Sequence, residues 1–385
     1  MTTKIIIAVG LTISDFRLKP IYLLLIAIEL CDMKVDEVES CSFEQWYPEF
    51  SKVTFKSRIL PLPQPVVDYL RSDGGIVLPV ECDNDKLHQT NSDDWLEETS
   101  EFNENVDSGE NILERPSFPE FAVSVRLALT DLGGSVIPKL NWSAPRDASW
   151  MGLANSLKCT TLSEIMLLLK SSEFVIHDLT QPYKDCDDQD NLTKDDKSYV
   201  MVLRRWSDGL NPGSEFRCFV KNNRLFAACQ RDNNQHYTHI KDERQSIMRD
   251  IQTFYDEHIS SKLSNSDTRE KCVLKLGSHP NFVFDIFRKR KDLVRLVDFN
   301  PFGPTTDSLL FEWDELNSMP ETTMNEDGNE SFQFRFVENG AGIQPSGLRH
   351  YSIPTDFVDL ATGSDPHKFM DFLQLQQQIQ SKDGS

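Results

Sequence analysis

Two apolar segments around residue 290 constrain the fold more than any other part of the chain. Residues 281–288 and 293–301 are rich in Val, Ile and Phe and are separated by four charged residues. This pattern is typical of a β-hairpin. If the first and last of the four charged residues pair across a two-residue turn, Asp285 lies opposite Leu296. A loop with an odd number of residues would flip this register.

Three polar side chains are expected on one face of this hairpin. Residues two apart in a strand share a face, so Asp298 and Asn300 project to the same side as Asp285. Carboxylates in an apolar sheet require a cationic partner, and Mg²⁺ takes oxygen ligands, often together with nucleotide phosphates. Alternatively, Asp298 and Asn300 only end a strand in an Asx turn, and Asp285 pairs with an arginine. The spacing alone leaves both interpretations open.

The net charge limits the kind of partner. The chain has 385 residues and a formal charge of −21, which argues against direct nucleic-acid binding, because phosphate recognition needs a basic surface. Twelve acidic residues and a single base lie in residues 81–114. We expect an acidic, disordered insertion there.

The sequence also limits the compartment. No apolar run approaches the roughly 20 residues that a membrane-spanning helix needs, so no membrane association is expected. Eight scattered cysteines without a CxxC pair favour reduced thiols in a cytoplasmic protein. For residues 1–37, a removable leader, a mis-assigned start and a packed extension all remain open.

Hairpins dominate the second half of the chain, which favours an α+β fold with mainly antiparallel sheets. Asn222–Asn223 is expected to form the turn of an earlier hairpin. Expected helices span residues 43–50, 119–132, 161–169, 240–263 and 365–379, and Thr161 and Glu164 form a capping-box signature at the start of the third. Residues 57–65 are expected to be extended because of their prolines, and expected strands span residues 135–142, 174–178, 199–206, 215–220 and 225–230.

Phosphates would have to be held by side chains, because the sequence contains no GxxxxGK[ST] or GxGxxG loop. The candidates are Lys139, the Arg204–Arg205 pair and Arg217. A cation on a buried strand is costly unless it meets an anion. Arg204 and Arg205 alternate, so one of the two is expected to face solvent. Lys139 has two candidate partners within the protein, Asp147 and Asp298.

Four motifs together resemble the cell division cycle protein 123 family. They are Pro138–Ala148, Gly213–Phe219, Leu296–Gly303 and Phe357–Leu360, and the resemblance runs from about residue 43 to residue 375. Members of that family are assembly factors for eukaryotic translation initiation factor 2 and have an ATP-grasp fold. The resemblance implies an ATP-grasp-like α+β protein in which two lobes, with mainly antiparallel sheets, enclose a nucleotide cleft.

The resemblance also implies a domain division and a set of site residues. The expected parts are an N-terminal extension (1–37), an N-terminal lobe (38–196), a C-terminal lobe (197–318), and a final segment with a polar loop and a terminal helix (319–385). The implied ligands of Mg²⁺ are Asp285, Asp298 and Asn300, which also contact ATP. The other implied ATP-binding residues are Lys139, Asn141, Ala144, Asp147, Arg204, Arg205, Trp206, Ser207 and Arg217.

The function implied is that of a monomeric, ATP-binding assembly chaperone. It would bind the γ subunit of initiation factor 2 and promote assembly of the heterotrimer, supporting translation initiation and cell-cycle progression. No residue is assigned a catalytic role. One alternative is an ATP-grasp ligase or kinase that forms an acyl phosphate on a carboxylate. Another is a nucleotide-free scaffold in which Asp285 and Asp298 pair with arginines.

Overall fold

The larger of two main sheets is built from the second half of the chain. The computed structural model describes residues 33–72, 75–88, 115–189, 198–264, 275–321, 323–324 and 330–339. The strand order is β10-β5-β4-β6-β7, antiparallel except for the parallel pair β10–β5. The strands are β4 (Glu215–Lys221), β5 (Arg224–Gln230), β6 (Phe282–Arg290), β7 (Leu293–Pro301) and β10 (Gln333–Arg335).

The smaller sheet is antiparallel and has the order β1-β3-β2. Its strands are β1 (Ser57–Pro61), β2 (Val136–Lys139) and β3 (Val200–Arg205). The expected domain boundary between residues 196 and 197 falls just before β3, which is the central strand of this sheet. A short third pairing joins β8 (Thr323–Met324) to β9 (Glu330–Ser331).

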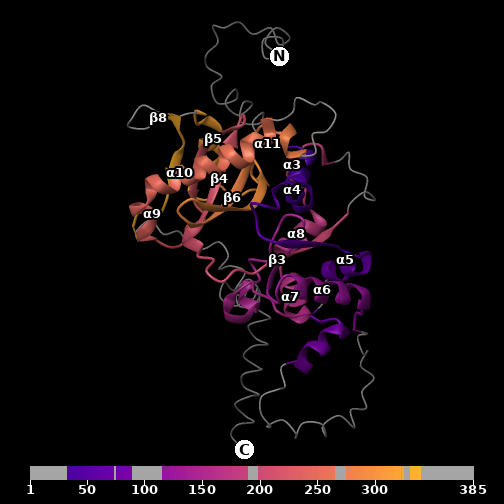
Figure 1. The fold of residues 1–385 in the computed structure, drawn as a ribbon. Helices are drawn as coiled ribbons and strands as arrows, with labels where there is room; N and C mark the ends of the chain where they lie inside the picture. Colours follow the sequence, from indigo (N-terminus) through magenta and orange to yellow (C-terminus); the bar gives the residue numbers. More distant parts are fainter. Residues whose placement is uncertain are drawn as a thin grey trace, which may run out of the picture.

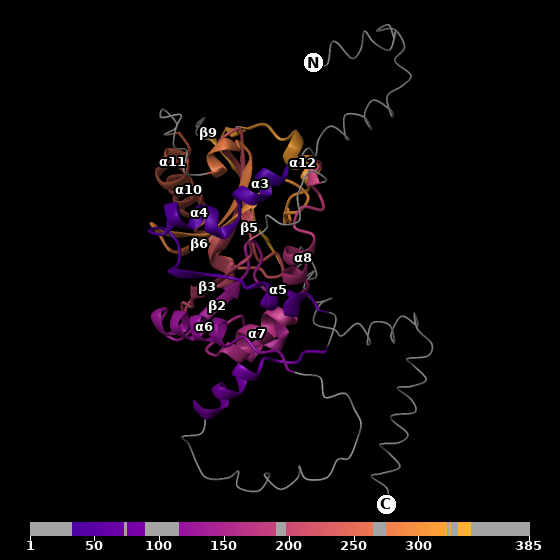
Figure 2. The ribbon, with the colours of Figure 1, turned by 90° about the vertical axis from the view of Figure 1, so that its right-hand side faces the viewer.

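Helices cover both sheets (Figures 1 and 2). Around the smaller sheet lie α5 (Gln64–Arg71), α6 (Pro119–Asp131), α7 (Leu162–Lys170) and α8 (Glu173–Thr180). Around the larger sheet lie α3 (Val35–Ser40), α4 (Phe43–Phe50), α9 (Thr238–Asp242), α10 (Arg244–Phe254), a π-helical turn (Tyr255–Ser260), α11 (Ser261–Ser264) and α12 (Trp313–Ser318). None of the helices in the described ranges is long and apolar enough to cross a membrane.

The larger sheet buries both of its faces. One face packs on α10 and on the aromatic residues of α4, with Trp46 and Phe50 against Phe299. The opposite face carries Phe219 and packs on α12 and its preceding loop. Strand parity places Arg217 on this second face, beyond the apolar cluster. The α+β class with mainly antiparallel sheets is therefore confirmed.

Local signals in the sequence explain several elements that were predicted correctly. Thr161 and Glu164 form the expected capping box of α7. Gly133 has a φ of +90° directly after α6, a conformation that glycine adopts without strain. Asn222 and Asn223 both have positive φ in the β4–β5 turn.

Residues 174–178 form part of helix α8 and not the expected strand. The Ser172 hydroxyl accepts a hydrogen bond from the Val175 N–H at the start of the helix. Val175 and Leu179, four residues apart, are both buried. A short apolar run fits a strand or a buried helix equally well, and the helix cap decides between them.

Three further segments differ from expectation. Residues 64–65, the end of the segment expected to be extended, begin helix α5, and the helix expected over 240–263 is divided into shorter helical segments. Val80–His88 is a 3₁₀ helix within the expected acidic loop, held by Arg115 and Arg126, which pair with Asp83 and Asp85. The rest of that insertion, the terminal helix and the Phe357–Leu360 motif lie outside the described residues.

The turn of the β6–β7 hairpin lies one residue later than expected. Arg290 pairs with Leu293, so Lys291–Asp292 forms the two-residue turn. Asp292 has a φ of +57°, which Asp tolerates better than most side chains. The predicted register of this hairpin is therefore wrong.

Candidate functional site

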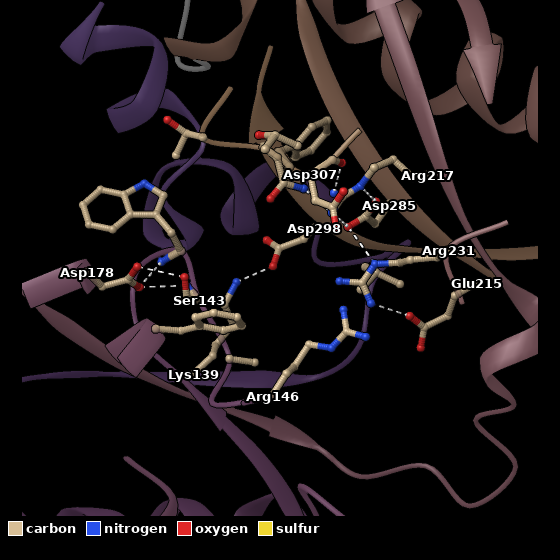
Figure 3. A pocket seen from close by; sticks show the side chains of 18 of the residues that line it. Lys139, Ser143, Arg146, Asp178, Glu215, Arg217, Arg231, Asp285, Asp298 and Asp307 are labelled. Carbon is tan, nitrogen blue, oxygen red and sulfur yellow. Dashed lines mark hydrogen bonds and ion pairs between the residues drawn. The ribbon is translucent and has the colours of Figure 1, made fainter. Parts of the chain in front are cut away.

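A cavity of about 1120 Å³ lies where the two main sheets face each other. Lys139 and Arg204 reach it from the smaller sheet, and Arg217, Asp285 and Asp298 reach it from the larger one (Figure 3). The register explains the first group, because Lys139 lies opposite Val202 in β3, two residues before Arg204. Both cations therefore project from the same face of the smaller sheet.

A bulge in β7 aligns the acidic residues. Asp285 pairs with Asp298, whereas the next pair along the hairpin is Ile286 with Leu296, so Val297 has no cross-strand partner. Relative to the expected pairing of Asp285 with Leu296, the register has moved by two residues. Such a shift preserves parity, so Asp285 and Asp298 still share a face.

Asp285 is buried and accepts hydrogen bonds on both oxygens, most of them on Oδ2. Arg217 donates through Nε to Oδ1 and through Nη2 to Oδ2, both at 2.8 Å, and Arg231 Nε donates to Oδ2 at 3.1 Å. Asn300 Nδ2 lies 3.4 Å from the same Oδ2. Burial alone would raise the pKa of Asp285, but the two guanidinium groups outweigh it and lower the pKa to about 2.

Only one of the two carboxylate oxygens of Asp298 has a hydrogen-bond donor among the described residues. Lys139 Nζ donates to Asp298 Oδ2 at 2.5 Å, whereas Asp298 Oδ1 is buried without a hydrogen-bond partner among the described residues. Of the two intramolecular partners expected for Lys139, the structure shows Asp298. Burial lowers the pKa of Lys139, an effect that Asp298 opposes.

Arg204 and Arg205 diverge, as their alternation predicts. Arg204 is buried and donates a hydrogen bond to the Val297 carbonyl at 2.7 Å. This bond gives a partner to the backbone carbonyl at the bulge. Arg205 is exposed and also lines the cavity. Ala144 lines the cavity as well.

Four predicted site residues lie elsewhere and are not among the described residues that line the cavity. The Asn141 side chain bonds the Val200 N–H, and Asp147 accepts hydrogen bonds from Ser172 Oγ and the Phe174 N–H. Trp206 Nε1 donates to Asp208. Ser207 lies in the same loop, after β3. In this structure Asn141 and Asp147 hold the backbone around the cavity.

Two arginines at the cavity were not predicted from the sequence. Arg231 directly follows β5 and donates hydrogen bonds to Glu215, at 2.7 Å, and to Asp285. Because it lies just beyond the end of the strand, strand alternation does not predict the direction of its side chain. Arg146 lies within the Pro138–Ala148 motif and lines the cavity, and its side chain has no hydrogen bond or ion pair with any described residue. Figure 3 shows its guanidinium beside that of Arg231. Arg146 is exposed, and the charge of the neighbouring Arg231 is the main cause that lowers the pKa of Arg146 to about 10.

Asp178 was also missed, because its segment was expected to be a strand. It accepts hydrogen bonds from the Ser143 hydroxyl at 2.8 Å and from the backbone N–H groups of Ser143 and Trp142. Burial raises the pKa of Asp178 to about 6. The carboxylate therefore fixes the loop that follows Lys139.

The charges in the cavity favour an anion at one end. Around Asp298 lie four carboxylates and five cations; these are Glu215, Asp285, Asp298 and Asp307, and Lys139, Arg146, Arg204, Arg217 and Arg231. The difference, 5 − 4, leaves one positive charge. The whole cavity lining is close to neutral, since acids such as Asp178 occupy other parts of it. The excess of cations is therefore local.

The donor set fits a magnesium-bound polyphosphate. Among the described residues no group of three His, Cys, Asp or Glu side chains is placed to hold a metal ion alone. Mg²⁺ is usually bound by one or two carboxylates and completed by substrate phosphates, and the unpartnered Oδ1 of Asp298 supplies a ligand of that kind. Bound there, the ion would neutralise phosphate charge.

The family model called D123 matches residues 46–361 of this chain. The chain belongs to the D123 family. The matched range includes every predicted site residue and both sheets of the fold, and it confirms the resemblance indicated by the sequence motifs.

Relatives in the D123 family carry an informative name. A protein of Xenopus laevis is 43% identical over 355 residues, covering 91% of this chain and 99% of its own length. One of Schizosaccharomyces pombe is 35% identical over 354 residues, covering 90% of this chain and 97% of its own length. Both are named "Translation initiation factor eIF2 assembly protein". The solved structure of Cdc123 from Schizosaccharomyces pombe is similar, with a TM-score of 0.61 and 33% identity, and the match covers 80% of this chain and 99% of that one.

Proposed function

We propose that this D123-family chain is an assembly factor for translation initiation factor eIF2 that binds Mg²⁺-ATP in the cavity between its sheets. In this proposal the two sheets belong to the two lobes of an ATP-grasp-like fold. The client is the γ subunit, and the factor acts in the cytoplasm as a monomer. The names of the relatives support the role in eIF2 assembly.

The observation that carries the nucleotide-binding part is the unpartnered Asp298 Oδ1 among surplus cations. The ion pairs of Asp285 with Arg217 and Arg231 agree with the nucleotide-free scaffold alternative. That alternative leaves one feature unexplained, namely a buried carboxylate oxygen of Asp298 without a donor among the described residues. A metal ion bound together with an anionic ligand accounts for it.

In the proposed mechanism the protein's own cationic groups orient the phosphates. Lys139 and Arg204 reach the cavity from the smaller sheet, and Arg217 reaches it from the larger one, so a ligand contacting all three would hold the sheets together. Nucleotide would favour the client-binding conformation only if that conformation binds it more tightly.

Calorimetric titration with Mg²⁺-ATP tests this function. Asp298→Asn keeps the side-chain size but removes the charge, so we expect affinity to fall at least tenfold, a loss of about 1.4 kcal/mol. Asp131→Asn is the matched control, because Asp131 pairs with Lys56 and Arg58 on the surface. It should bind like the wild type.

A pulldown with the γ subunit, with and without Mg²⁺-ATP, tests the client. Nucleotide should increase recovery with the wild type and have no effect with Asp298→Asn. No ATP binding by the wild type would favour the scaffold alternative. Stoichiometric release of ADP with an amide or phosphorylated product would favour the ligase or kinase alternative.

A further inference from the structure

Cations are concentrated in two segments at the β7 edge of the larger sheet. Residues 51–58 and 289–295 together hold seven lysines and arginines and a single acid, Asp292, in a chain whose formal charge is −21. Segment 289–295 spans the turn of the β6–β7 hairpin, and segment 51–58 runs from the end of α4 into β1. The charge of these two segments is therefore opposite to that of the whole chain.

The two segments lie side by side and form one surface, which we call the basic belt. Thr54 pairs in parallel with Leu296, and the Leu296 N–H donates to the Val53 carbonyl at 2.9 Å. The Arg295 guanidinium donates to the Thr54 carbonyl at 3.1 Å. Because the pairing is parallel, the rise from the turn to Leu296 and the rise from Thr54 to residue 58 add, at about 13 Å each. The belt is therefore about 26 Å long, which matches an extended peptide of about eight residues.

The cations at the tip of the hairpin have no partner within the described part of the chain. Lys289, Arg290 and Lys291 are exposed and form no ion pair with any described residue. Arg288, directly before them, is by contrast buried and pairs with Asp250 of α10. Neighbouring like charges repel each other, and a cluster of this kind attracts anions to the surface. The tip of the hairpin therefore suits a polyanionic partner.

The other end of the belt shows which anion it accepts. Asp131, the last residue of α6, accepts hydrogen bonds from Arg58 Nε at 2.7 Å and from Lys56 Nζ at 3.2 Å. All three side chains are exposed, so these ion pairs are weak and exchange readily with other anions. A carboxylate of the protein itself therefore already occupies one end of the belt.

Two observations favour a short acidic peptide over a nucleic acid. With Asp131 and Asp292 included, the belt carries 7 − 2, or five, positive charges, so the rest of the chain carries −21 − 5, or −26. A nucleic acid longer than the belt would extend over this acidic remainder and be repelled. Single-stranded nucleic acids also stack on aromatic rings, and the one aromatic residue of the belt, Phe55, is partly buried against Phe287 and Arg204.

We propose that the basic belt binds an extended, acidic segment of a partner protein. Carboxylates of that segment pair with the three cations at the tip of the hairpin and, at the other end, displace Asp131 from Lys56 and Arg58. The contacts are exposed, so binding weakens as the salt concentration rises. None of these groups is assigned to Mg²⁺-ATP, so this inference goes beyond the proposed function and does not depend on it.

Fluorescence anisotropy of a labelled oligoglutamate of about eight residues, the length matched to the belt, tests this proposal. The full-length protein is titrated into the peptide at low salt and without nucleotide. The triple variant Lys289→Ser/Arg290→Ser/Lys291→Ser should bind about tenfold more weakly than the wild type, because each exposed ion pair contributes a factor of about two. The substituted side chains are exposed at a hairpin turn, so the fold is retained.

A second triple variant is the matched control for net charge. Lys34→Ser/Arg71→Ser/Lys184→Ser removes three exposed cations that lie outside the belt. The net charge of this variant equals that of the hairpin variant, so only the position of the lost charges differs. Because salt screens distant charges, its affinity for the peptide should change less than about twofold.

A single substitution at the other end of the belt should shift the affinity in the opposite direction. Asp131→Asn releases Lys56 and Arg58 for the peptide, so binding should become about fourfold tighter, a factor of about two for each cation. Asp314→Asn is the matched control, because it makes the same charge change at an exposed position on α12. It should leave the affinity for the peptide unchanged.

Loss of affinity in the hairpin variant and gain in Asp131→Asn, with neither change in the controls, would support the belt as an acidic-peptide site. Equal losses in the two triple variants would reduce the effect to net charge and would overturn the proposal. Tighter binding of an RNA oligonucleotide with the same number of charges would overturn it in favour of a nucleic-acid site. A wild type that does not bind the peptide would also overturn it, while the proposed Mg²⁺-ATP site would still stand.

Discussion

The buried Lys139–Asp298 ion pair gives the most demanding prediction. The side chains are 2% and 16% exposed. Removing one partner of a buried pair costs about 3–5 kcal/mol, because the other charge is left uncompensated. Asp298 keeps some contact with solvent, so we expect Lys139→Met to lower the free energy of unfolding by about 3 kcal/mol.

The double variant Lys139→Met/Asp298→Asn removes both charges, so no unpaired carboxylate is left buried. Its decrease in the free energy of unfolding should be smaller, by about 2 kcal/mol, than the sum of the decreases in the two single variants. Urea unfolding without nucleotide, followed by tryptophan fluorescence, measures all four proteins of this cycle. Because nucleotide is absent, the cycle reports the ion pair alone.

Lys56→Met is the surface control. Lys56 pairs with Asp131, and these side chains are 49% and 37% exposed, so the loss should stay below about 1 kcal/mol. Equal losses for Lys139→Met and Lys56→Met would refute the argument. So would strict additivity in the double variant.

Three other perturbations test separate parts of the structure. Arg288→Met leaves the buried Asp250 carboxylate of α10 without its ion-pair partner in β6 and should lower the free energy of unfolding in urea by about 3 kcal/mol, without changing the calorimetric affinity for Mg²⁺-ATP. Folding raises the pKa of Asp178 from 3.8 to about 6, so ionisation of Asp178 opposes folding as the pH rises through this range. Between pH 5 and 7.5 the free energy of unfolding of the wild type should fall by about 1.4 kcal/mol relative to Asp178→Asn. A difference between the two proteins that does not change with pH would contradict the raised pKa. Gly133→Ala places a Cβ at a φ of +90° and should lower stability by about 1 kcal/mol, whereas Gly75→Ala, which meets nothing within 4 Å, should have little effect on the thermal midpoint.

The sequence predicted the shared face of Asp285 and Asp298 but not how it arises. Parity depends only on whether the register shift is even, and a shift of two residues kept it. The bulge at Val297 has no local signal, because a Val in an apolar strand looks the same whether paired or not. Its position depends on Arg204, from another sheet, which bonds its carbonyl.

Other failures have a common physical origin. The segment 174–178 is helical because Asp147 and Ser172 accept hydrogen bonds from backbone N–H groups at the start of α8. Asp147 is distant from this helix in the sequence, so no local pattern reveals its contribution. Arg146 and Arg231 lie outside strands, so neither period nor parity predicts where they point. Capping boxes, asparagine turns and hairpins were predicted because their signals are local.

The packing of α4 on the larger sheet has a consequence for biosynthesis. Phe43, Trp46 and Phe50 are fully buried, yet their partners Phe282 and Phe299 lie in β6 and β7. On the ribosome these three aromatic rings emerge long before the strands that cover them. The nascent chain therefore exposes these aromatic side chains until β6 and β7 have been synthesised. Cutting the gene between the two sheets would keep the core residues of the smaller sheet in one fragment, but it would separate the larger sheet from the aromatic helix that covers it.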